Sequence, residues 1–228
     1  MREVTATEER AWNAAALAKP VVEPAVTLWT YLRPAVVLGA AQRPTVELVA
    51  RAAAASIELV QRPTGGGAVL AGPWLLAASV VLPPGDPLVG ASILEAYRWL
   101  GLTFVDWLGA FGIGARLVAA PGRSSSWACF GVSSPGEVAV GPRKIVGLAQ
   151  ARRRQGVLLS AGALVAPPPW GVLCYVMGRP AADAVDLAER TTSVAQLAIA
   201  PLDELAAELS MRLATVLGQA CLMHRLSP

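Results

Sequence analysis

The alternation of hydrophobic and polar positions along the chain predicts a mixture of helices and strands. Apolar residues at helical spacing, with capping residues nearby, predict helices at residues 7–17, 46–56, 92–111 and 202–217. Apolar and β-branched runs bounded by glycine or proline predict strands at residues 25–31, 35–38, 57–60, 112–117, 137–141, 144–153 and 156–165. Residues 68–83 are predicted as a pair of strand segments broken at Gly72 and Pro73. No repeat or low-complexity linker divides the chain. We therefore expect one α+β domain over residues 1–228.

Single residues place the ends of two of the predicted helices. Thr7 can cap the first helix, because Glu8 and Glu9 then fall in its first turn, where the helix dipole favours acidic side chains. Gly218 is the expected end of the last helix, since glycine is common just past a helix C-terminus. These residues would satisfy backbone groups that a helix end leaves unpaired.

Two long uncharged stretches, residues 63–85 and 155–178, raise the question of a membrane. The first is interrupted by three glycines and Pro73, and the second by three prolines at residues 167–169. Neither can run as one spanning helix, because these residues break helices. We interpret both stretches as buried strands joined by turns and expect no membrane association.

The cysteines and the N-terminus indicate the cellular compartment. Cys129, Cys174 and Cys221 are odd in number and have no CxxC spacing, which favours reduced thiols over a disulfide framework. The first residues carry acidic side chains and no apolar core, so they do not form a secretory signal. We therefore expect a cytoplasmic protein.

The chain has few residues suited to proton transfer near neutral pH. It contains one histidine, His224, and only two lysines, Lys19 and Lys144, so almost all of its 19 basic residues are arginine. A metal site built on paired histidines is excluded, and we expect no metal. A Ser-His-Asp triad is also disfavoured. The net charge of +3 and a single basic run, residues 152–154, give no basis for nucleic-acid binding.

The first segment that can carry chemistry is Arg-Pro-Thr-Gly-Gly-Gly, residues 62–67. Consecutive glycines indicate either positive φ angles or the close approach of another molecule to the backbone. Arg62 offers a guanidinium fork, Thr64 a hydroxyl group and the glycine amides a cradle for an anionic or carbonyl group. A simple hairpin bend is the alternative at this stage.

Two further segments each centre on one reactive residue. Lys144 begins a strand of small and apolar residues, so its ammonium group either polarises a carbonyl in a pocket or lies on the surface at a turn. Gly147 and Ala149 leave one face of that strand without bulk, which suits an acyl chain lying across it. Cys129 lies in a loop of small residues and is more accessible than Cys174, although an inert thiol is also consistent with this position.

Taken together, these segments resemble the biotin/lipoate protein ligase superfamily, and within it the lipoate-protein ligase A and octanoyltransferase branch. The motifs that carry the resemblance are Asn-Ala-Ala-Ala-Leu at 13–17, PAVVLG at 34–39, RPTGGGAVL at 62–70, ACF at 128–130, GPRKIVGLAQARR at 141–153 and GVLLSAGAL at 156–164. They occur in the order and spacing of the family's RRxTGGGxVxH loop and GxKxxGxAQ strand. The resemblance spans roughly residues 10–218.

The resemblance implies a mixed, largely antiparallel sheet flanked by helices, with an acyl chain in a tunnel over the sheet. It implies that Cys129 and Lys144 are catalytic, the cysteine carrying the acyl group as a thioester and the lysine contacting the acyl carbonyl. The residues expected to bind the substrate are Arg62, Thr64, Gly65, Gly66, Gly67, Ala68, Gly147, Ala149, Gln150 and Gly162.

The function implied is transfer of an octanoyl or lipoyl group to a lysine of a lipoyl carrier domain. The expected partners are that carrier domain or an acyl carrier protein, and a small acyl substrate, with no tightly bound cofactor. The basic run at residues 152–154 is suited to meeting an acidic carrier. We expect no room for a separate C-terminal accessory domain.

The chain departs from the family pattern at its histidines. Ala71 stands where the RRxTGGGxVxH loop ends in histidine, Gln61 replaces its first arginine, and Ala161 replaces the histidine of an HGS or HGT segment. Two alternatives therefore stay open. One is an ATP-dependent lipoate-protein ligase using ATP and Mg²⁺, possibly with a separate accessory subunit. The other is a non-catalytic paralogue that binds the acyl group or the carrier.

Overall fold

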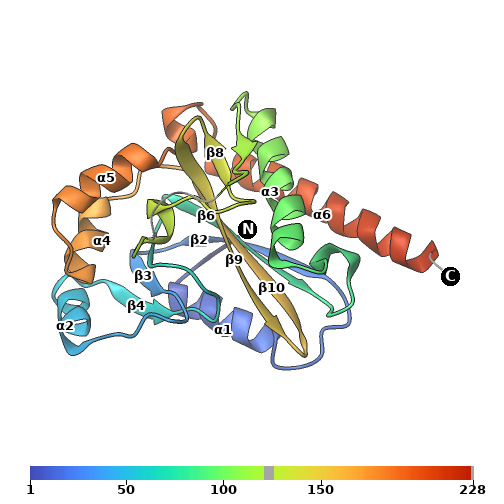
Figure 1. The fold of residues 1–228 in the computed structure, drawn as a ribbon, viewed down its shortest axis with the longest axis horizontal. Coiled ribbons are helices and arrows are strands. Elements are labelled where there is room, and N and C mark those ends of the chain that lie inside the picture. Colours follow the sequence, from blue (N-terminus) through green and yellow to red (C-terminus); the bar gives the residue numbers. More distant parts are fainter. Residues whose placement is uncertain (121–125, 227–228) are drawn as a thin grey trace.

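A computed structural model describes residues 1–120 and 126–226, and the side chains of all of these except residues 221–226. Its larger sheet has seven strands in the order β1-β2-β6-β10-β9-β8-β7 (Figure 1). These strands are β1 (Arg2–Val4), β2 (Ala25–Tyr31), β6 (Leu75–Leu82), β7 (Arg116–Leu117), β8 (Val138–Val140), β9 (Arg143–Arg153) and β10 (Gly156–Leu164). β1 pairs with β2 in parallel, and the other neighbouring strands pair antiparallel.

A second sheet of three strands has the order β4-β3-β5. Its strands are β3 (Ala35–Leu38), β4 (Glu58–Gln61) and β5 (Val69–Ala71). The helices are α1 (Ala6–Ala16), α2 (Val46–Ala54), α3 (Ile93–Ala110), α4 (Trp170–Met177), α5 (Ala182–Arg190) and α6 (Leu202–Leu226). Three short 3₁₀ turns, η1 (Pro87–Val89), η2 (Cys129–Gly131) and η3 (Val194–Gln196), complete the described elements.

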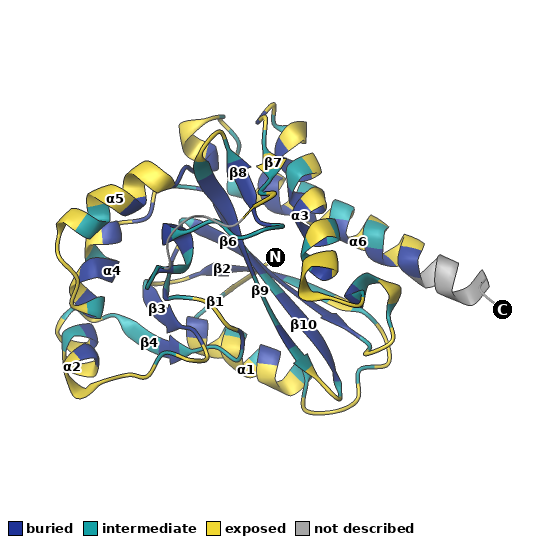
Figure 2. Ribbon diagram, in the orientation of Figure 1, coloured by how far each residue is buried: buried dark blue, intermediate teal, exposed yellow. Residues whose placement is uncertain are grey.

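Two hydrophobic cores lie on opposite faces of the seven-stranded sheet. On one face, α3 and α6 pack through residues such as Trp107 and Leu209 against the strands. On the other face, Trp29 and Leu75 pack toward the small sheet, α2 and α4. Because both faces are covered, the central strands β6, β9 and β10 are buried along most of their length (Figure 2). The expected α+β class, with a mostly antiparallel sheet flanked by helices, is confirmed.

Several element ends differ from the sequence prediction. Thr5, not Thr7, is the N-cap of α1, because Thr5 and Glu8 form a reciprocal capping box. α6 runs through Gly218 to Leu226, since one glycine costs an exposed helix only about 1 kcal/mol.

Three elements were absent from the prediction, namely β1, α4 and α5. α4 begins directly after the prolines at residues 167–169, which interrupt the stretch as predicted but also open a helix. Within the described part of the chain, no helix combines the length and the apolar character needed to cross a membrane. The side chains of Cys221 and His224 lie outside the described residues.

Replacing Thr5 by alanine tests the position of the α1 cap. We expect Thr5→Ala to lower the free energy of unfolding by about 1 kcal/mol, because the variant loses the side-chain acceptor for the Glu8 amide. Thr7→Ala is the matched control, and its effect should stay within about 0.5 kcal/mol. Urea unfolding of both variants measures the difference. Equal effects would place the cap elsewhere.

Candidate active site

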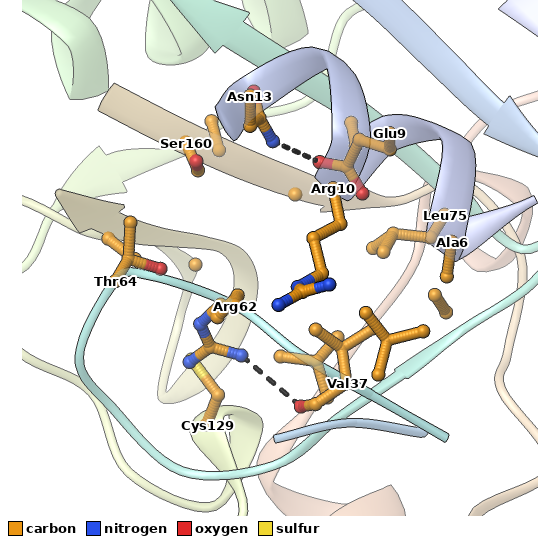
Figure 3. A pocket seen from close by; sticks show the side chains of 18 of the residues that line it. Ala6, Glu9, Arg10, Asn13, Val37, Arg62, Thr64, Leu75, Cys129 and Ser160 are labelled. Atoms are coloured by element: carbon orange, nitrogen blue, oxygen red, sulfur yellow. Dashed lines mark hydrogen bonds between the residues drawn. The ribbon is translucent and has the colours of Figure 1, made fainter. Parts of the chain in front are cut away.

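A cavity lies between the two sheets, closed on one side by α1. Its apolar walls come from both sheets, for example Val37 and Val60 of the small sheet and Leu75 and Ala77 of the large one. Polar and charged side chains also line it, among them Glu9, Arg10, Asn13, Arg62 and Thr64 (Figure 3). The cavity therefore combines an apolar interior with a few polar groups, which is the usual composition of a small-molecule site.

The floor of the cavity consists of small residues on β9 and β10. Gly147 pairs with Gly162 across the two strands, and Ala149 pairs with Ser160. All four line the cavity. Residues two apart on a strand share a face, so these positions remove side-chain bulk from one continuous strip of sheet. The strip leaves room for an extended chain to lie on the backbone.

The glycine loop, residues 65–67, packs against the segment that carries Cys129. A Cβ atom added at Gly67 would lie 2.5 Å from the carbonyl oxygen of Trp127. The Ala68 amide donates to that same oxygen at 2.8 Å, and the Cys129 amide donates to the Ala68 oxygen at 2.9 Å. The glycines thus permit close approach of another part of the chain, and they fix the position of Cys129.

Arg62 and Cys129 converge on the middle glycine of this loop. A Cβ atom at Gly66, which has a φ of +95°, would lie 2.9 Å from Arg62 Nη2 and 3.9 Å from Cys129 Sγ. Nη2 also donates to the carbonyl oxygens of Gly65 and Gly67 at 2.8 and 2.9 Å. Figure 3 shows the guanidinium group beside the half-buried Cys129 thiol. A permanent positive charge is therefore held next to the sulfur.

Lys144 does not line the cavity and is almost completely buried, with 1% of its surface exposed. Its ammonium group lies close to the cavity floor, because a Cβ atom added at Gly147 would be 3.6 Å from Lys144 Nζ. Its ammonium group pairs with Glu137 Oε2 at 2.7 Å and donates to the carbonyl oxygens of Cys129 and Val132 at 2.7 and 3.0 Å. These contacts use all three of its hydrogens. The contact of Lys144 with an acyl carbonyl stays a prediction.

Glu137 completes this buried arrangement. Its carboxylate accepts hydrogen bonds from the amides of Ser134 at 2.7 Å and Leu148 at 3.1 Å, in addition to the ammonium group of Lys144. The lysine side chain also lies over the ring of Phe130, 5.2 Å from its centroid. One ion pair therefore joins the Cys129 turn, the Val132 to Glu137 loop and strand β9.

A cluster of polar residues faces the cavity from α1 and β2. Tyr31 donates to Glu9 Oε2 at 2.7 Å, and Asn13 donates to Glu9 Oε1 at 3.3 Å (Figure 3). Burial raises the pKa of Glu9, although these hydrogen bonds and the charge of Arg62 oppose the shift. Burial and the neighbouring Glu9 also raise the pKa of Tyr31.

Several buried polar atoms on the cavity wall have no hydrogen-bond partner within the described residues. They are Asn13 Oδ1, Arg62 Nε and the hydroxyl of Thr64. Buried polar atoms are normally paired, and an unpaired one costs stability. These atoms are therefore available to a bound molecule.

The predicted site residues divide into two groups. Those that line the cavity are Cys129, Arg62, Thr64, Gly147, Ala149 and Gly162. Those that do not line it are Lys144, Gly65, Gly66, Gly67, Ala68 and Gln150. The latter group supports the former, because Lys144 and the glycine loop hold Cys129 in place.

Sequence reasoning missed Glu9, Asn13, Tyr31 and Glu137. Glu137 could have been found from the sequence. It is a single acidic residue at the start of an apolar strand, and it shortly precedes one of only two lysines in the chain. Glu9 gave no such signal, because an acidic residue in the first turn of a helix is common. Ala71 and Ala161, which replace the family's histidines, both line the cavity.

Comparison with known proteins identifies the family. Residues 2–211 match the family described as Lipoyl protein ligase A/B catalytic domain. The chain belongs to this family. The expectation of an acyl-transfer enzyme within the biotin/lipoate ligase superfamily is therefore confirmed.

Among relatives of this lipoyl ligase A/B domain, the octanoyltransferase LipM of Exiguobacterium sp. is 31% identical over 200 residues, covering 83% of this chain and 70% of the relative. The octanoyltransferase LipM of Kyrpidia tusciae is 35% identical over 155 residues, covering 63% of this chain and 55% of that protein. A lipoate protein ligase structure from T. acidophilum with bound lipoic acid has a TM-score of 0.74 at 22% identity, covering 96% of this chain and 84% of that one. That structural likeness supports the fold.

Breaking the Lys144–Glu137 pair tests its structural role. We expect Lys144→Met to lower the free energy of unfolding by about 3–5 kcal/mol, because it leaves a buried carboxylate unpaired. Combining it with Glu137→Gln should cost less than the sum of the single changes. Denaturant unfolding of the four proteins gives the coupling energy.

The exposed pair of Arg190 and Asp186 is the matched control. Arg190→Ala should cost at most about 1 kcal/mol, because solvent screens that pair. A cost for Lys144→Met as small as this would contradict the structural role.

The raised pKa of Glu9 predicts a pH-dependent effect of Glu9→Gln. When a carboxyl group has a higher pKa in the folded state, the folded protein loses stability as the pH rises from the unfolded-state pKa of that group, 4.5, through its folded-state pKa. The variant escapes this loss, so its stability relative to the parent should rise over that window. Glu8→Gln is the control and should show the opposite trend, because the hydrogen bonds from Thr5 lower the pKa of Glu8. Chemical unfolding at several pH values measures both, and a pH-independent difference for Glu9→Gln would contradict the prediction.

Proposed function

We propose that this domain transfers an octanoyl or lipoyl group from a thioester donor to the ε-amino group of a lysine on a lipoyl carrier domain, through a thioester on Cys129. The observation that carries the proposal is the position of Cys129. Its thiol lines the cavity, half-buried, at the end where Arg62 lies. No other cysteine and no histidine is among the described residues that line this cavity.

Two balanced steps make up the transfer. In the first step, the Cys129 sulfur attacks the acyl carbonyl carbon and forms a new carbon–sulfur bond, the bond to the donor sulfur breaks, and the donor thiol leaves with the proton from Cys129. In the second step, the lysine amine forms a bond to the same carbon. The bond to Cys129 breaks, and a proton from the amine returns to the sulfur.

The cavity accounts for binding of the acyl chain. The strip of Gly147, Ala149, Ser160 and Gly162 supports an extended aliphatic chain without side-chain obstruction. Arg62 provides positive charge near the position where the acyl oxygen becomes negative, which is the most effective place for such a group. The Cys129 amide already donates to the carbonyl oxygen of Ala68, so it does not stabilise the negative charge on the acyl oxygen.

Lys144 acts in this scheme as a positioning residue. Its ammonium group holds the carbonyl oxygen of Cys129 and so sets the direction in which the thiol leaves the backbone. Ala71 and Ala161 supply no proton-transfer group at the positions where the family pattern has histidine. No tightly bound cofactor is required by these steps.

Intact mass spectrometry after exposure to an octanoyl thioester tests the proposal. We expect an adduct of octanoyl mass on the parent protein, and its loss in Cys129→Ser, because the nucleophile is removed. The matched control is Cys174→Ala, which should retain the adduct because Cys174 is buried in the core and does not line the cavity. Adding a lipoyl carrier domain should move the octanoyl mass from the enzyme to the carrier.

Other outcomes would point to the alternatives. Formation of an acyl-adenylate from ATP and free octanoate, with Cys129→Ser still active, would indicate an ATP-dependent ligase. A protein that forms neither product but shows a higher melting temperature with octanoate or lipoate would be a binding subunit. Either result would contradict the thioester mechanism.

A further inference from the structure

A second cleft adjoins the cavity on the outer side of α1. Four arginines from four separate segments line it, and we refer to it as the arginine cleft: Arg10 of α1, Arg43 between β3 and α2, Arg62 after β4, and Arg153 at the end of β9. Arg10, Asn13, Arg62 and Pro63 line both the cleft and the cavity. A molecule can therefore occupy the two spaces at once.

The arginine cleft is lined by positive charge, and the nearest acidic group the structure places against one of its arginines is Glu9, in the adjoining cavity near Arg62. No aspartate or glutamate is among the described residues that line it. The ion pairs formed elsewhere in the described ranges, such as those of Arg179 and Arg212 with acids one helical turn away, involve none of its four arginines. A cleft lined by one sign of charge concentrates the electrostatic field and attracts an oppositely charged group.

Backbone contacts fix two of the guanidinium groups at the boundary with the cavity. Arg10 Nε donates to the carbonyl oxygen of Gln61 at 2.8 Å, and Arg62 is held by the glycine loop. Arg62 Nε and Asn13 Oδ1 are buried at this boundary without a partner. Arg43 and Arg153 are exposed on the outer wall. Two guanidinium groups held at the boundary and two exposed ones thus surround one space.

The basic run at residues 152–154 does not act as a unit. Arg152 donates to the carbonyl oxygens of Val89 and Ser92, at 2.8 and 2.7 Å, and is committed to the body of the protein. Arg153 lines the arginine cleft, and Arg154 does not. Of the three arginines, only Arg153 contributes to the arginine cleft, and a role of the exposed Arg153 and Arg154 in meeting an acidic carrier stays a prediction.

We propose that the arginine cleft binds a phosphate ester on the thiol arm of the acyl donor. The inference rests on the proposed function, because the donor thioester must reach Cys129 while its arm leaves the cavity through the shared boundary. Guanidinium groups match phosphate oxygens in geometry and charge, and they keep their charge at all physiological pH values. The cleft thereby selects donors that carry a phosphate over donors with the same acyl group and no phosphate.

A pair of donors that differ only in the phosphate tests this. The rate of Cys129 acylation, followed by intact mass spectrometry, is measured with octanoyl-4′-phosphopantetheine and with octanoyl-pantetheine. We expect the parent protein to favour the phosphorylated donor by at least about tenfold, as charge-assisted hydrogen bonds to one phosphate would give. The double variant Arg43→Ala/Arg153→Ala should bring the ratio of the two rates close to one.

Arg154→Ala is the matched control, because it removes an adjacent exposed arginine that does not line the cleft, and it should keep the ratio of the parent. If the parent protein is acylated by both donors at nearly equal rates, phosphate binding by the arginine cleft would be contradicted, whereas the proposed function would not. Absence of acylation by both donors would instead overturn the proposed function. Comparing octanoyl-coenzyme A with octanoyl acyl carrier protein, which both carry this phosphate, then identifies its source.

Discussion

The buried ion pair between Lys144 and Glu137 is the interaction on which the rest of the site depends. Removing two charges from water is costly, and the structure compensates with further hydrogen bonds from the Ser134 and Leu148 amides to the carboxylate. The same ammonium group binds the carbonyl of Cys129. The position of the thiol is therefore set by electrostatics behind the cavity wall.

The cavity owes its shape to the absence of large side chains. Gly147 and Gly162 face each other across two central strands, and Ala71 contributes only a methyl group to the wall. The methyl group of Ala161 packs on the opposite face of the sheet, so this residue leaves only backbone at the cavity. A methyl group at Ala71 in place of an imidazole ring makes this part of the wall apolar and removes a proton acceptor near neutral pH. The polar groups of the cavity wall come from two places, the Glu9 cluster on α1 and β2 and the segment of Arg62 and Thr64.

The helices and strands with a clear periodic pattern, and the motifs of the site, could be predicted from the sequence. The direction of every side chain could not. The strands at residues 25–31 and 35–38 have the expected bounds, because β-branched runs and flanking glycine and proline mark them clearly. Lys144 was correctly singled out as unusual. Its direction depends on Glu137, which the turn between β8 and β9 brings alongside, and this pairing is a tertiary contact. The arginine cleft could not be predicted for the same reason, because it forms only when four segments that are distant in sequence come together.

The contact between Lys144 and position 129 runs through the main-chain carbonyl and leaves the side chain free. The backbone there is also bound through its amide to Ala68. A residue of similar size that keeps its amide, such as serine or alanine, can therefore occupy position 129 without loosening the turn. This separates the fold of the site from its chemistry: a chain of this kind can exchange its nucleophile, or lose it and become a binding protein, by a single codon change. An amine-bearing side chain introduced there would hold the acyl group as a stable amide and trap the loaded state.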